Sequence, residues 1–341
     1  MVKYRITAYC LTQNDIITPK HERNCLMRKL PALLTAATMI FALSGTFAHA
    51  ESGSLVVLGD SITTGYGLDG YTAGDNSSAA GSFANQLSAG YAEYSNFAVD
   101  GRTSGELLTA LEDEDVSAAL AGADAVVISI GGNDFLQPMI SAVMSAAISD
   151  PSIKEMLSGG ADEADYLNAI QQLMEVVLEA ANEVDASAVC ENISEILAAV
   201  KAAAPGSQVI ILTVYDPFEG VAGMEMFDVV AREKLAELNS GISEAAAANG
   251  AEVADVAAAF KGHAAEYTNI ASMDIHPSQT GHDVIYSLLT DITGVPSAPA
   301  IAEPTTDTTK GSPDTGAGSA AVFAGIAALA GSGILASRRR K

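Results

Sequence analysis

The sequence predicts a three-layer α/β/α sandwich built on a parallel five-stranded sheet. Short apolar runs recur along the chain, and their apolar residues are consecutive, which is typical of strands buried on both faces. A stretch with helical spacing or helix caps follows each run, and this alternation is the pattern of parallel strands joined by helical crossovers. The expected strands are residues 55–58, 94–99, 125–130, 207–214 and 252–256.

The first strand leads directly into the residue around which we expect the functional site to be built. Its apolar run stops at Gly59, and Asp60 and Ser61 come next. Gly101 follows the second strand and Asn133 follows the third. Loops at the carboxyl ends of parallel strands form the ligand sites of open α/β sheets, so these three loops are expected to surround one point.

Helices are expected between these strands over residues 82–90 and 103–111, and another begins at about residue 113. Ser82 is a suitable N-cap, and Gly90 lies just beyond the end of the first of these helices. Residues 65–78 are rich in glycine and small polar residues, which favour turns. We expect them to form a loop that walls the cleft beside Ser61.

Residues 137–204 have an almost continuous helical pattern that is broken at Pro151, at Gly159-Gly160 and near Asp185. This segment is longer than a simple crossover between parallel strands requires. We therefore expect a helical insertion that covers one side of the cleft and sets the shape of the substrate. A plain packing role is the alternative.

The last third of the chain supplies a second set of chemically useful side chains. A helix is expected over residues 224–249, with Gly250 after its end, and a final helix over residues 280–291. Asp274 and His276 lie in the loop before that final helix, and an imidazole is the base that a serine nucleophile needs. His263 and His282 are expected at the surface. No cofactor is expected, and no metal, because no cluster of histidines and cysteines has the spacing of a zinc site.

Four sequence blocks in this order resemble those of the SGNH, or GDSL-type, hydrolase family. The resemblance covers about residues 55–292. It implies a flavodoxin-like fold and an enzyme that hydrolyses carboxylic esters. The blocks are Gly59-Asp60-Ser61, Gly101, Gly131-Gly132-Asn133-Asp134 and His276-Pro277.

The resemblance also implies a role for each of these residues. Ser61 becomes the nucleophile and His276 its base, while the Ser61 and Gly101 backbone amides and the Asn133 side chain bind the oxyanion. Asp60 and Asp134 are expected to fix the surrounding loops by accepting hydrogen bonds. The Gly-x-Ser-x-Gly turn of the α/β-hydrolases is absent around Ser61.

The group that orients His276 is left open by the sequence. The family pattern places an acid three residues before the histidine, but that position is Met273, and Asp274 is only two residues before. One alternative is a Ser61, His276 and Asp274 triad. The other is a dyad in which the Met273 backbone carbonyl accepts the imidazole N–H. We favour the triad, because a carboxylate stabilises an imidazolium better than a carbonyl does.

Residues 1–50 have the features of a leader that ends in a secretory signal. A basic segment at residues 27–29 precedes an apolar run to residue 43, and Ala48-His49-Ala50 is a typical cleavage site. Residues 1–26 fit poorly before such a signal, so Met27 is a candidate translation start. An uncleaved membrane anchor is the alternative.

The other end of the chain predicts attachment to a cell surface. Residues 294–311 form a Pro- and Thr-containing spacer, and residues 312–316 read Ser-Pro-Asp-Thr-Gly. This pentapeptide resembles the Leu-Pro-x-Thr-Gly signal that sortases cleave, here between Thr315 and Gly316, with Ser312 in place of leucine. The uncharged residues 317–337 are long enough to span a bilayer, and a basic tail follows them. A retained membrane anchor is the alternative to sortase cleavage.

Charge and cysteine content narrow the possible partners. Residues 51–316 contain 7 of the 17 basic and 40 of the 42 acidic residues, so their net charge is near −33. Such a charge argues against nucleic acid or an anionic membrane as a partner. Cys190 is the only cysteine in this segment, so no intrachain disulfide is possible, and its apolar helical surroundings predict a small buried side chain.

Two classes of function remain after these considerations. The first is a secreted, surface-attached esterase or acylhydrolase that acts on small-molecule, polysaccharide or lipid esters and has a sortase-like transpeptidase as partner. The second is a wall-displayed binding or adhesion protein that keeps the fold. The joint presence of Ser61, Gly101, Asn133 and His276 favours the enzyme. The acyl group and the alcohol are left open.

Overall fold

The computed structural model describes residues 53–295 apart from residues 223 and 273. The expected leader, almost all of the spacer, and the sorting signal with Thr315, Gly316 and the span 317–337 lie outside the described residues. Within residues 53–295, no helix is both long enough and apolar enough to cross a bilayer.

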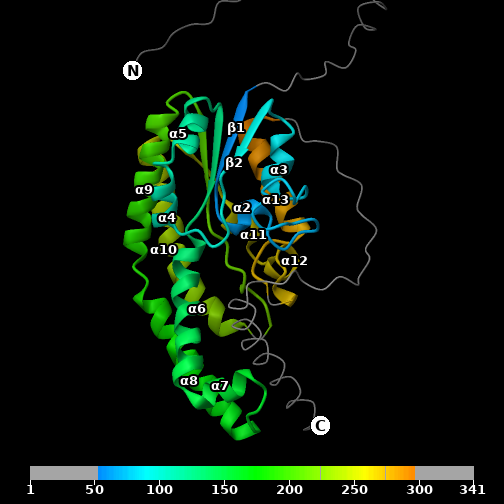
Figure 1. The fold of residues 1–341 in the computed structure, drawn as a ribbon, viewed down its shortest axis with the longest axis vertical. Coiled ribbons are helices and arrows are strands. Elements are labelled where there is room, and N and C mark those ends of the chain that lie inside the picture. The colour runs from blue at the N-terminus through cyan, green and yellow to red at the C-terminus, as the bar shows by residue number, and fades with distance from the viewer. Residues whose placement is uncertain (1–52, 223, 273, 296–341) are drawn as a thin grey trace, which may run out of the picture. The chain divides into compact units, whose positions relative to one another are not determined.

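The five expected strands pair in one parallel sheet with the order β2-β1-β3-β4-β5 (Figure 1). Leu55 of β1 lies opposite Tyr94 of β2 on one side and Ala125 of β3 on the other. The predicted fold class is therefore confirmed. The strands are β1 (Ser54–Gly59), β2 (Glu93–Asn96), β3 (Ala125–Ser129), β4 (Gln208–Leu212) and β5 (Glu252–Ala254).

Helices cover both faces of the sheet, and successive residues of β1 point to opposite sides. Val56 and Leu58 pack in the core under one helical layer, whereas Leu55 and Val57 pack in the core under the other. The first layer is α4 (Ser104–Ala110), α5 (Glu114–Ala121), α9 (Ala186–Ala203) and α10 (Glu225–Asn249). The second is α3 (Phe83–Ser88), α11 (Val256–Phe260) and α13 (Gln279–Thr293).

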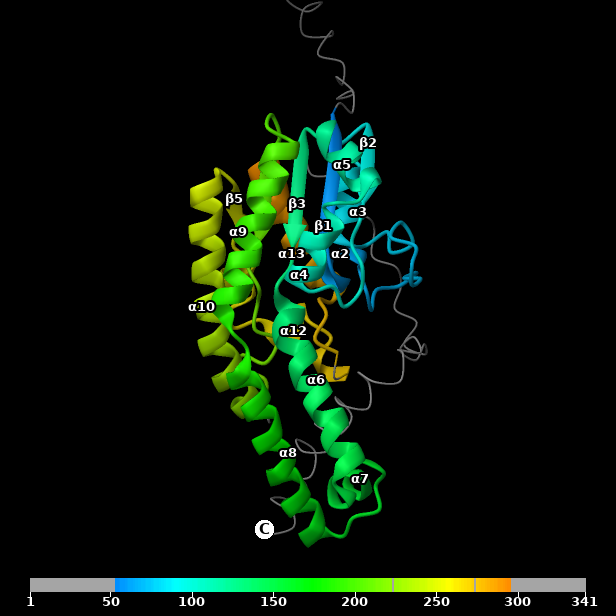
Figure 2. The same ribbon diagram turned by 60° about the vertical axis from the view of Figure 1, so that its left-hand side comes forward.

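A third core lies away from the sheet, between α6 (Gly132–Ser149), α7 (Pro151–Leu157) and α8 (Glu163–Glu183). Val143, Met156 and Leu173 are among its buried residues. Figures 1 and 2 show α6 and α8 running side by side past the carboxyl ends of the strands, with α7 at their far end. Within the segment 137–204, α9 packs along the sheet, and α6 reaches the same core through Met139.

The helix boundaries follow from local signals in the sequence. Pro151 is the first residue of α7, where a missing N–H costs nothing, and Asp150 caps the helix. Asp185 caps α9, and Gly250 ends α10 with a left-handed φ of 65°. Strand β2 ends earlier than residue 99, although the Phe97 and Val99 amides still donate to the carbonyls of Val57 and Gly59 in β1.

Candidate active site

Ser61 is the first residue of the one-turn helix α2 (Ser61–Thr64), which follows β1 after a single residue. That residue, Asp60, is the N-cap, and its Oδ1 accepts a hydrogen bond of 3.0 Å from the Ile62 amide. The strand order reverses between β1 and β3, and Ser61 therefore lies at the position where doubly wound sheets bind ligands. The residue is only 7% exposed.

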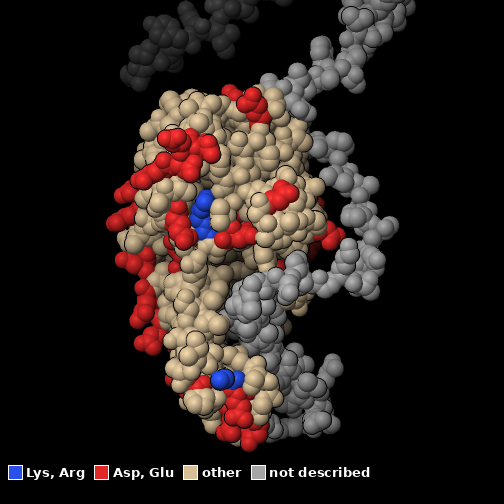
Figure 3. Space-filling model, viewed as in Figure 1, with Lys and Arg blue, Asp and Glu red and all other residues tan. Residues whose placement is uncertain are grey.

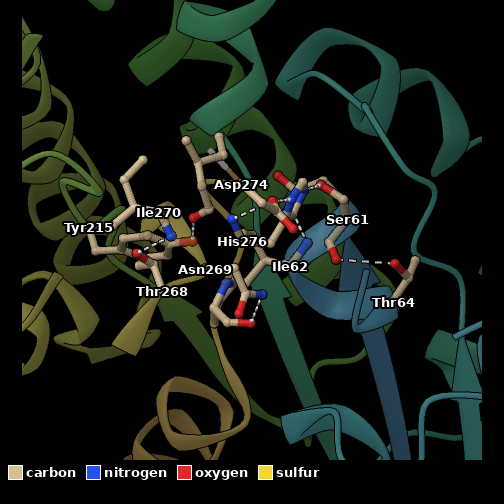
Figure 4. A network of polar contacts seen from close by, with 12 residues as sticks. Ser61, Ile62, Thr64, Tyr215, Thr268, Asn269, Ile270, Asp274 and His276 are labelled. Carbon is tan, nitrogen blue, oxygen red and sulfur yellow. Dashed lines mark hydrogen bonds and ion pairs between the residues drawn. The ribbon is translucent and has the colours of Figure 1, made fainter. Parts of the chain in front are cut away.

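His276 lies in the loop that precedes α13, and two distant residues fix the backbone of that loop. The Tyr215 hydroxyl, just beyond β4, donates to the Ile275 carbonyl at 2.7 Å. The Asn269 amide donates to the His276 carbonyl at 2.9 Å. Figure 4 shows Tyr215 and Asn269 reaching the loop from one side while Ser61 lies on the other.

The loop brings Ser61, His276 and Asp274 into one hydrogen-bonded chain. The Ser61 Oγ lies 2.9 Å from His276 Nε2, and His276 Nδ1 lies 2.5 Å from Asp274 Oδ1. The same carboxylate oxygen accepts the His276 backbone N–H at 3.0 Å. An ionised carboxylate can only accept, so the Nδ1 proton points to Asp274 and Nε2 is left to accept the Ser61 proton. Met273, the alternative orienting residue, lies outside the described residues.

Gly101 has the left-handed φ of 77° that favours glycine, and its carbonyl accepts a 2.5 Å hydrogen bond from Gln137 Nε2 of α6. Within residues 53–295, neither the Gly101 N–H nor the Ser61 N–H donates to a protein acceptor. Two backbone donors at the strand ends are thus available to a ligand.

Asn133 is buried in the first turn of α6, and its side-chain amide already has two protein acceptors. Its Nδ2 lies 3.1 Å from the Arg102 carbonyl and 3.3 Å from Asp60 Oδ2. The contact with Asp60 is the longer and therefore the weaker of the two. The structure therefore brings Asn133 to the site, although its amide is directed toward Asp60.

Asp60 and Asp134 hold the helices that carry these residues. Burial raises the pKa of Asp60 to about 7, although the Ile62 amide and the charge of His276 act in the opposite direction. Asp134, on α6, accepts from the Ser104 amide at 2.9 Å and from the Ser104 hydroxyl at 2.7 Å. Burial also raises the pKa of Asp134. Asp134 thereby ties α6 to the start of α4, next to the Gly101 loop.

The loop over residues 65–78 walls one side of the His276 imidazole. The ring centroids of Tyr66 and His276 are 4.4 Å apart with an angle of 39° between the planes, and Tyr71 packs 5.0 Å from Tyr66. The Tyr71 hydroxyl bonds the Asp100 carboxylate, which also accepts from Thr64 Oγ1 at 2.7 Å. The composition of the loop indicated a wall, but nothing in it indicated that Tyr66 contacts His276.

Glycine is required at position 67 of this loop. Gly67 has a φ of 86°, and a Cβ at this position would lie 2.9 Å from Asp274 Oδ2. A side chain at position 67 would therefore be strained and would displace the Asp274 carboxylate.

The expectation for His282 is wrong, because this residue is fully buried and not at the surface. Its Nδ1 accepts the Phe83 amide at 3.2 Å, its ring stacks on Phe83, and burial lowers its pKa to about 3. His282 shares a helical face with the buried Ile285, Tyr286 and Leu289, and that spacing was the available signal. His263 is half exposed, as expected.

Cys190 is half-buried, less than its apolar surroundings predicted. It lies where α9 packs closely on α10, and a Cβ on Gly241 of α10 would collide with its sulfur. Within the described part of the chain, no group of three His, Cys, Asp or Glu side chains is placed to hold a metal ion.

A cavity of about 160 Å³ begins at Ser61 and His276. Its other walls are mainly apolar side chains from α6, α8 and α10 and from the chain after β4. Ser61 and His276 thus lie at one end of a space that α6, α8 and α10 help to enclose.

Residues 57–284, about two thirds of the chain, match the model of the GDSL-like lipase/acylhydrolase family. No curated protein matches the chain. Among solved structures, the extracellular lipase of Streptomyces rimosus is similar, with 20% identity, a TM-score of 0.50, and coverage of 70% of this chain and 99% of that one. Phospholipase A1 from Streptomyces albidoflavus NA297 has 22% identity and a TM-score of 0.49 over 70% of this chain and 99% of that one.

At 20% identity, the likeness to the Streptomyces rimosus lipase shows the fold alone. The family match supports more than the fold, because it covers the whole sheet from β1 to the first turns of α13 and includes Ser61, Asp274 and His276. The chain therefore belongs to the GDSL-like lipase/acylhydrolase family and is a hydrolytic enzyme.

Proposed function

We propose that this protein hydrolyses carboxylic esters with Ser61 as the nucleophile, His276 as the general base and Asp274 as the group that orients His276. The observation that carries the proposal is the chain of contacts from Ser61 Oγ to His276 Nε2 and from His276 Nδ1 to Asp274 Oδ1. A serine hydroxyl with such partners is the activated nucleophile of acyl transfer.

The reaction takes two steps in this proposal. His276 Nε2 removes the Ser61 proton as Oγ attacks the ester carbonyl, and the tetrahedral adduct then collapses with loss of the alkoxide, which takes that proton from His276. Water, deprotonated by His276, attacks the acyl-Ser61 ester; this second adduct collapses to the carboxylic acid, and the leaving Ser61 Oγ takes the proton back from His276. Asp274 stabilises the imidazolium that forms in each step.

The negative charge on the carbonyl oxygen needs donors that are in place before the reaction. The Ser61 and Gly101 backbone amides, both without protein acceptors within residues 53–295, supply two of them. The Asn133 side chain supplies a third when its hydrogen leaves Asp60. Loss of one such donor typically lowers turnover by about 100- to 1,000-fold.

The test is hydrolysis of p-nitrophenyl butyrate by wild type and by Ser61→Ala, with Ser149→Ala as the matched control. Ser61→Ala removes the nucleophile and is expected to abolish turnover and labelling by a fluorophosphonate, with an unchanged circular dichroism spectrum. Ser149 is exposed near the end of α6, and its replacement is expected to change nothing. Turnover by Ser61→Ala close to the wild-type rate would reject the assignment.

We also propose that the enzyme is secreted and attached to the cell surface. The signal-like segment before Glu51 and the Ser-Pro-Asp-Thr-Gly motif with its apolar span and basic tail support this location. Sortase cleavage is expected to release a product that ends at Thr315 when the wall is digested, and Thr315→Ala is expected to block it. Material that detergent alone extracts, with the mass of a chain still ending at Lys341, would establish a retained membrane anchor.

A further inference from the structure

The loop that carries the Gly101 amide is a four-residue turn. The Arg102 amide donates to the Val99 carbonyl at 3.1 Å, and Gly101, the third residue, has a φ of 77°. A positive φ at the third position is the conformation of a type II turn. The Gly101 N–H belongs to the central peptide of the turn, which joins Asp100 to Gly101. The orientation of this one peptide therefore decides where the Gly101 N–H points.

The other common turn type would point this N–H in the opposite direction. A type I turn differs from type II mainly by a rotation of the central peptide, by about 150° or more. Glycine adopts both signs of φ, so the residue itself permits either turn. Among the described residues other than its chain neighbours, only Gln137 comes within 4 Å of a Cβ built on Gly101. Steric exclusion alone therefore does not hold the amide in place.

Two side chains of α6 hold the turn from one side. Gln137 Nε2 donates to the Gly101 carbonyl at 2.5 Å, and Asn133 Nδ2 donates to the Arg102 carbonyl at 3.1 Å. Gln137 and Asn133 are four residues apart and therefore lie on one face of the helix. This face of α6 thus binds the two successive carbonyls that follow the central peptide.

The residue before the central peptide is held from the other side. The Asp100 carboxylate accepts from Thr64 Oγ1 at 2.7 Å and from the Tyr71 hydroxyl. Thr64 is the last residue of α2, the helix that begins with Ser61. The contacts of Asp100 and the Gly101 carbonyl therefore anchor the central peptide at both of its ends.

We propose that Gln137 and Tyr71 are positioning residues that lock the Asp100–Gly101 peptide with its N–H toward the oxyanion. The proposal rests on the proposed esterase function and states how that site keeps one of its donors in place. Gln137 acts on the peptide through the Gly101 carbonyl, and Tyr71 acts on it through the Asp100 carboxylate. A hydrogen bond of ordinary net strength shifts an equilibrium between two orientations by about 2- to 12-fold.

The first test removes the donor on α6. Gln137→Met keeps nearly the same side-chain size at an exposed position, and Gln172→Met is the same change at an exposed glutamine of α8. We expect Gln137→Met to lower kcat for p-nitrophenyl butyrate by about 2- to 12-fold, with KM within about twofold, because the oxyanion forms only in the transition state. Gln172→Met is expected to match wild type. Gln137→Lys supplies a new donor and is expected to recover most of the lost kcat.

The second test removes the hydroxyl on the other side of the turn. Tyr71→Phe keeps the ring that packs on Tyr66 but no longer donates to Asp100. Because both residues bias one equilibrium, the double variant with Gln137→Met is expected to lose more kcat than the product of the two single losses. Two residues that merely stabilise separate parts of the fold would give at most that product.

The orientation of the peptide can also be followed without turnover. The dipeptide Asp-Gly occurs in the sequence only at residues 69–70 and 100–101. Labelling the full chain with carbonyl-¹³C aspartate and ¹⁵N glycine therefore isolates the amides of Gly70 and Gly101 in an NMR spectrum. We expect one sharp Gly101 resonance in wild type and an exchange-broadened or doubled one in Gln137→Met. The Gly70 resonance serves as the internal control and is expected to stay unchanged.

Three results would overturn the inference while the esterase function stands. They are a wild-type kcat in Gln137→Met, an equal loss of kcat in Gln172→Met, and a single sharp Gly101 resonance in Gln137→Met protein that has lost activity. If Gln137→Lys is as impaired as Gln137→Met, the donor is not what matters and the inference also fails. Failure of wild type to hydrolyse any ester, with the change in the Gly101 resonance still present, would instead reject the proposed function alone.

Discussion

At the scale of single residues, Asp274 holds His276 through one oxygen that accepts both the ring N–H and the backbone N–H. Asp274→Asn keeps the size of the side chain but removes its charge, and a neutral amide cannot stabilise the imidazolium or fix its tautomer. In serine hydrolases the loss of a true triad acid costs about 10,000-fold in turnover, and we expect a loss of this order on p-nitrophenyl butyrate.

The control for this prediction is Asp283→Asn, the same change at an exposed aspartate of α13 that bonds Gln86 and Gln279. It is expected to leave turnover within twofold of wild type. A loss of less than roughly tenfold in Asp274→Asn would favour a Ser61 and His276 dyad oriented by the Met273 carbonyl.

His282 is a buried base whose charged form the folded protein disfavours. Its pKa is about 3 in the folded state and 6.5 in a solvated chain, so between these pH values the unfolded state binds more protons. The free energy of unfolding therefore decreases as the pH falls from 6.5 toward 3, and a shift of this size is worth up to about 5 kcal/mol.

His282→Asn keeps an acceptor near the Phe83 amide but does not titrate. We expect urea unfolding of this variant to depend less on pH between 6.5 and 4 than that of wild type. His263→Asn, at a half-exposed position, serves as the control and is expected to keep the wild-type slope. If the free energy of unfolding of His282→Asn depends on pH as strongly as that of wild type, His282 is not the cause of the pH dependence.

Tyr66 places its ring against the His276 imidazole, and ring pairs of this kind contribute about 0.5 to 1.5 kcal/mol. If that energy serves to keep His276 aligned with Ser61, Tyr66→Ala is expected to lower kcat by about 2- to 12-fold. Tyr66→Phe keeps the ring and is expected to stay closer to wild type. Full activity in Tyr66→Ala would show that Asp274 and the loop backbone are enough to keep His276 aligned with Ser61.

At the scale of elements, the carboxylate of Asp134 joins the N-terminus of α6 to the N-terminus of α4, which follows the Gly101 loop. It accepts two hydrogen bonds from Ser104, and Ser104 Oγ in turn accepts one from Asn192 of α9. Hydrogen bonds to a charged group are worth about 1.5 to 3 kcal/mol, and an unpaired buried N–H adds a cost. Asp134→Ala is therefore expected to lower the free energy of unfolding by about 2 to 4 kcal/mol.

The same substitution is expected to lower turnover, because the Gly101 amide loses the tie that positions its loop. Ser104→Ala removes the hydroxyl's bonds to Asp134 and Asn192 but keeps the backbone bond to Asp134, so its cost is expected to be smaller, about 1 to 2 kcal/mol. Urea unfolding and ester hydrolysis of both variants give the comparison. The idea fails if Ser104→Ala costs as much as Asp134→Ala, or if Asp134→Ala keeps wild-type turnover.

At the scale of the whole molecule, the excess of acidic side chains is the dominant property of the surface. Figure 3 shows that acidic groups outnumber basic ones on the face that it displays, and that many of them lie along the edge formed by α9 and α10. Residues 51–316 contain 40 acidic and 7 basic residues. Self-repulsion on this scale opposes compact structure, and salt screens it.

We therefore expect the midpoint of urea unfolding to rise as sodium chloride is raised from 10 to 200 mM, since the Debye length falls over that range from about 30 Å to less than 8 Å. The same experiment in matched concentrations of sucrose controls for general solute effects. A midpoint that falls with salt would mean that attractive ion pairs outweigh the repulsion.

The sequence alone determined the architecture of this protein and the position of its candidate nucleophile. The central strands β1, β3 and β4 are apolar runs, and several helices carry their own caps, such as Ser82, Asp150 and Asp185, so these elements are encoded by residues that are neighbours in the chain. Ser61 follows a buried strand directly, and a parallel sheet brings the ends of its strands to one edge. These signals are local, and a single sequence is sufficient to read them.

Only the tertiary structure decided how the side chains meet at that edge. It decided that Asp274 reaches His276 from two residues away, because Tyr215 and Asn269 fix the backbone of the loop. It also decided the contact of Tyr66 with His276 and the burial of His282. The cavity between α6, α8 and α10 is likewise a feature that only the tertiary structure decided. Such contacts join residues that are far apart in the chain. The periodicity of a segment indicates how that segment folds and which face it buries, but it does not indicate which other segment packs against that face.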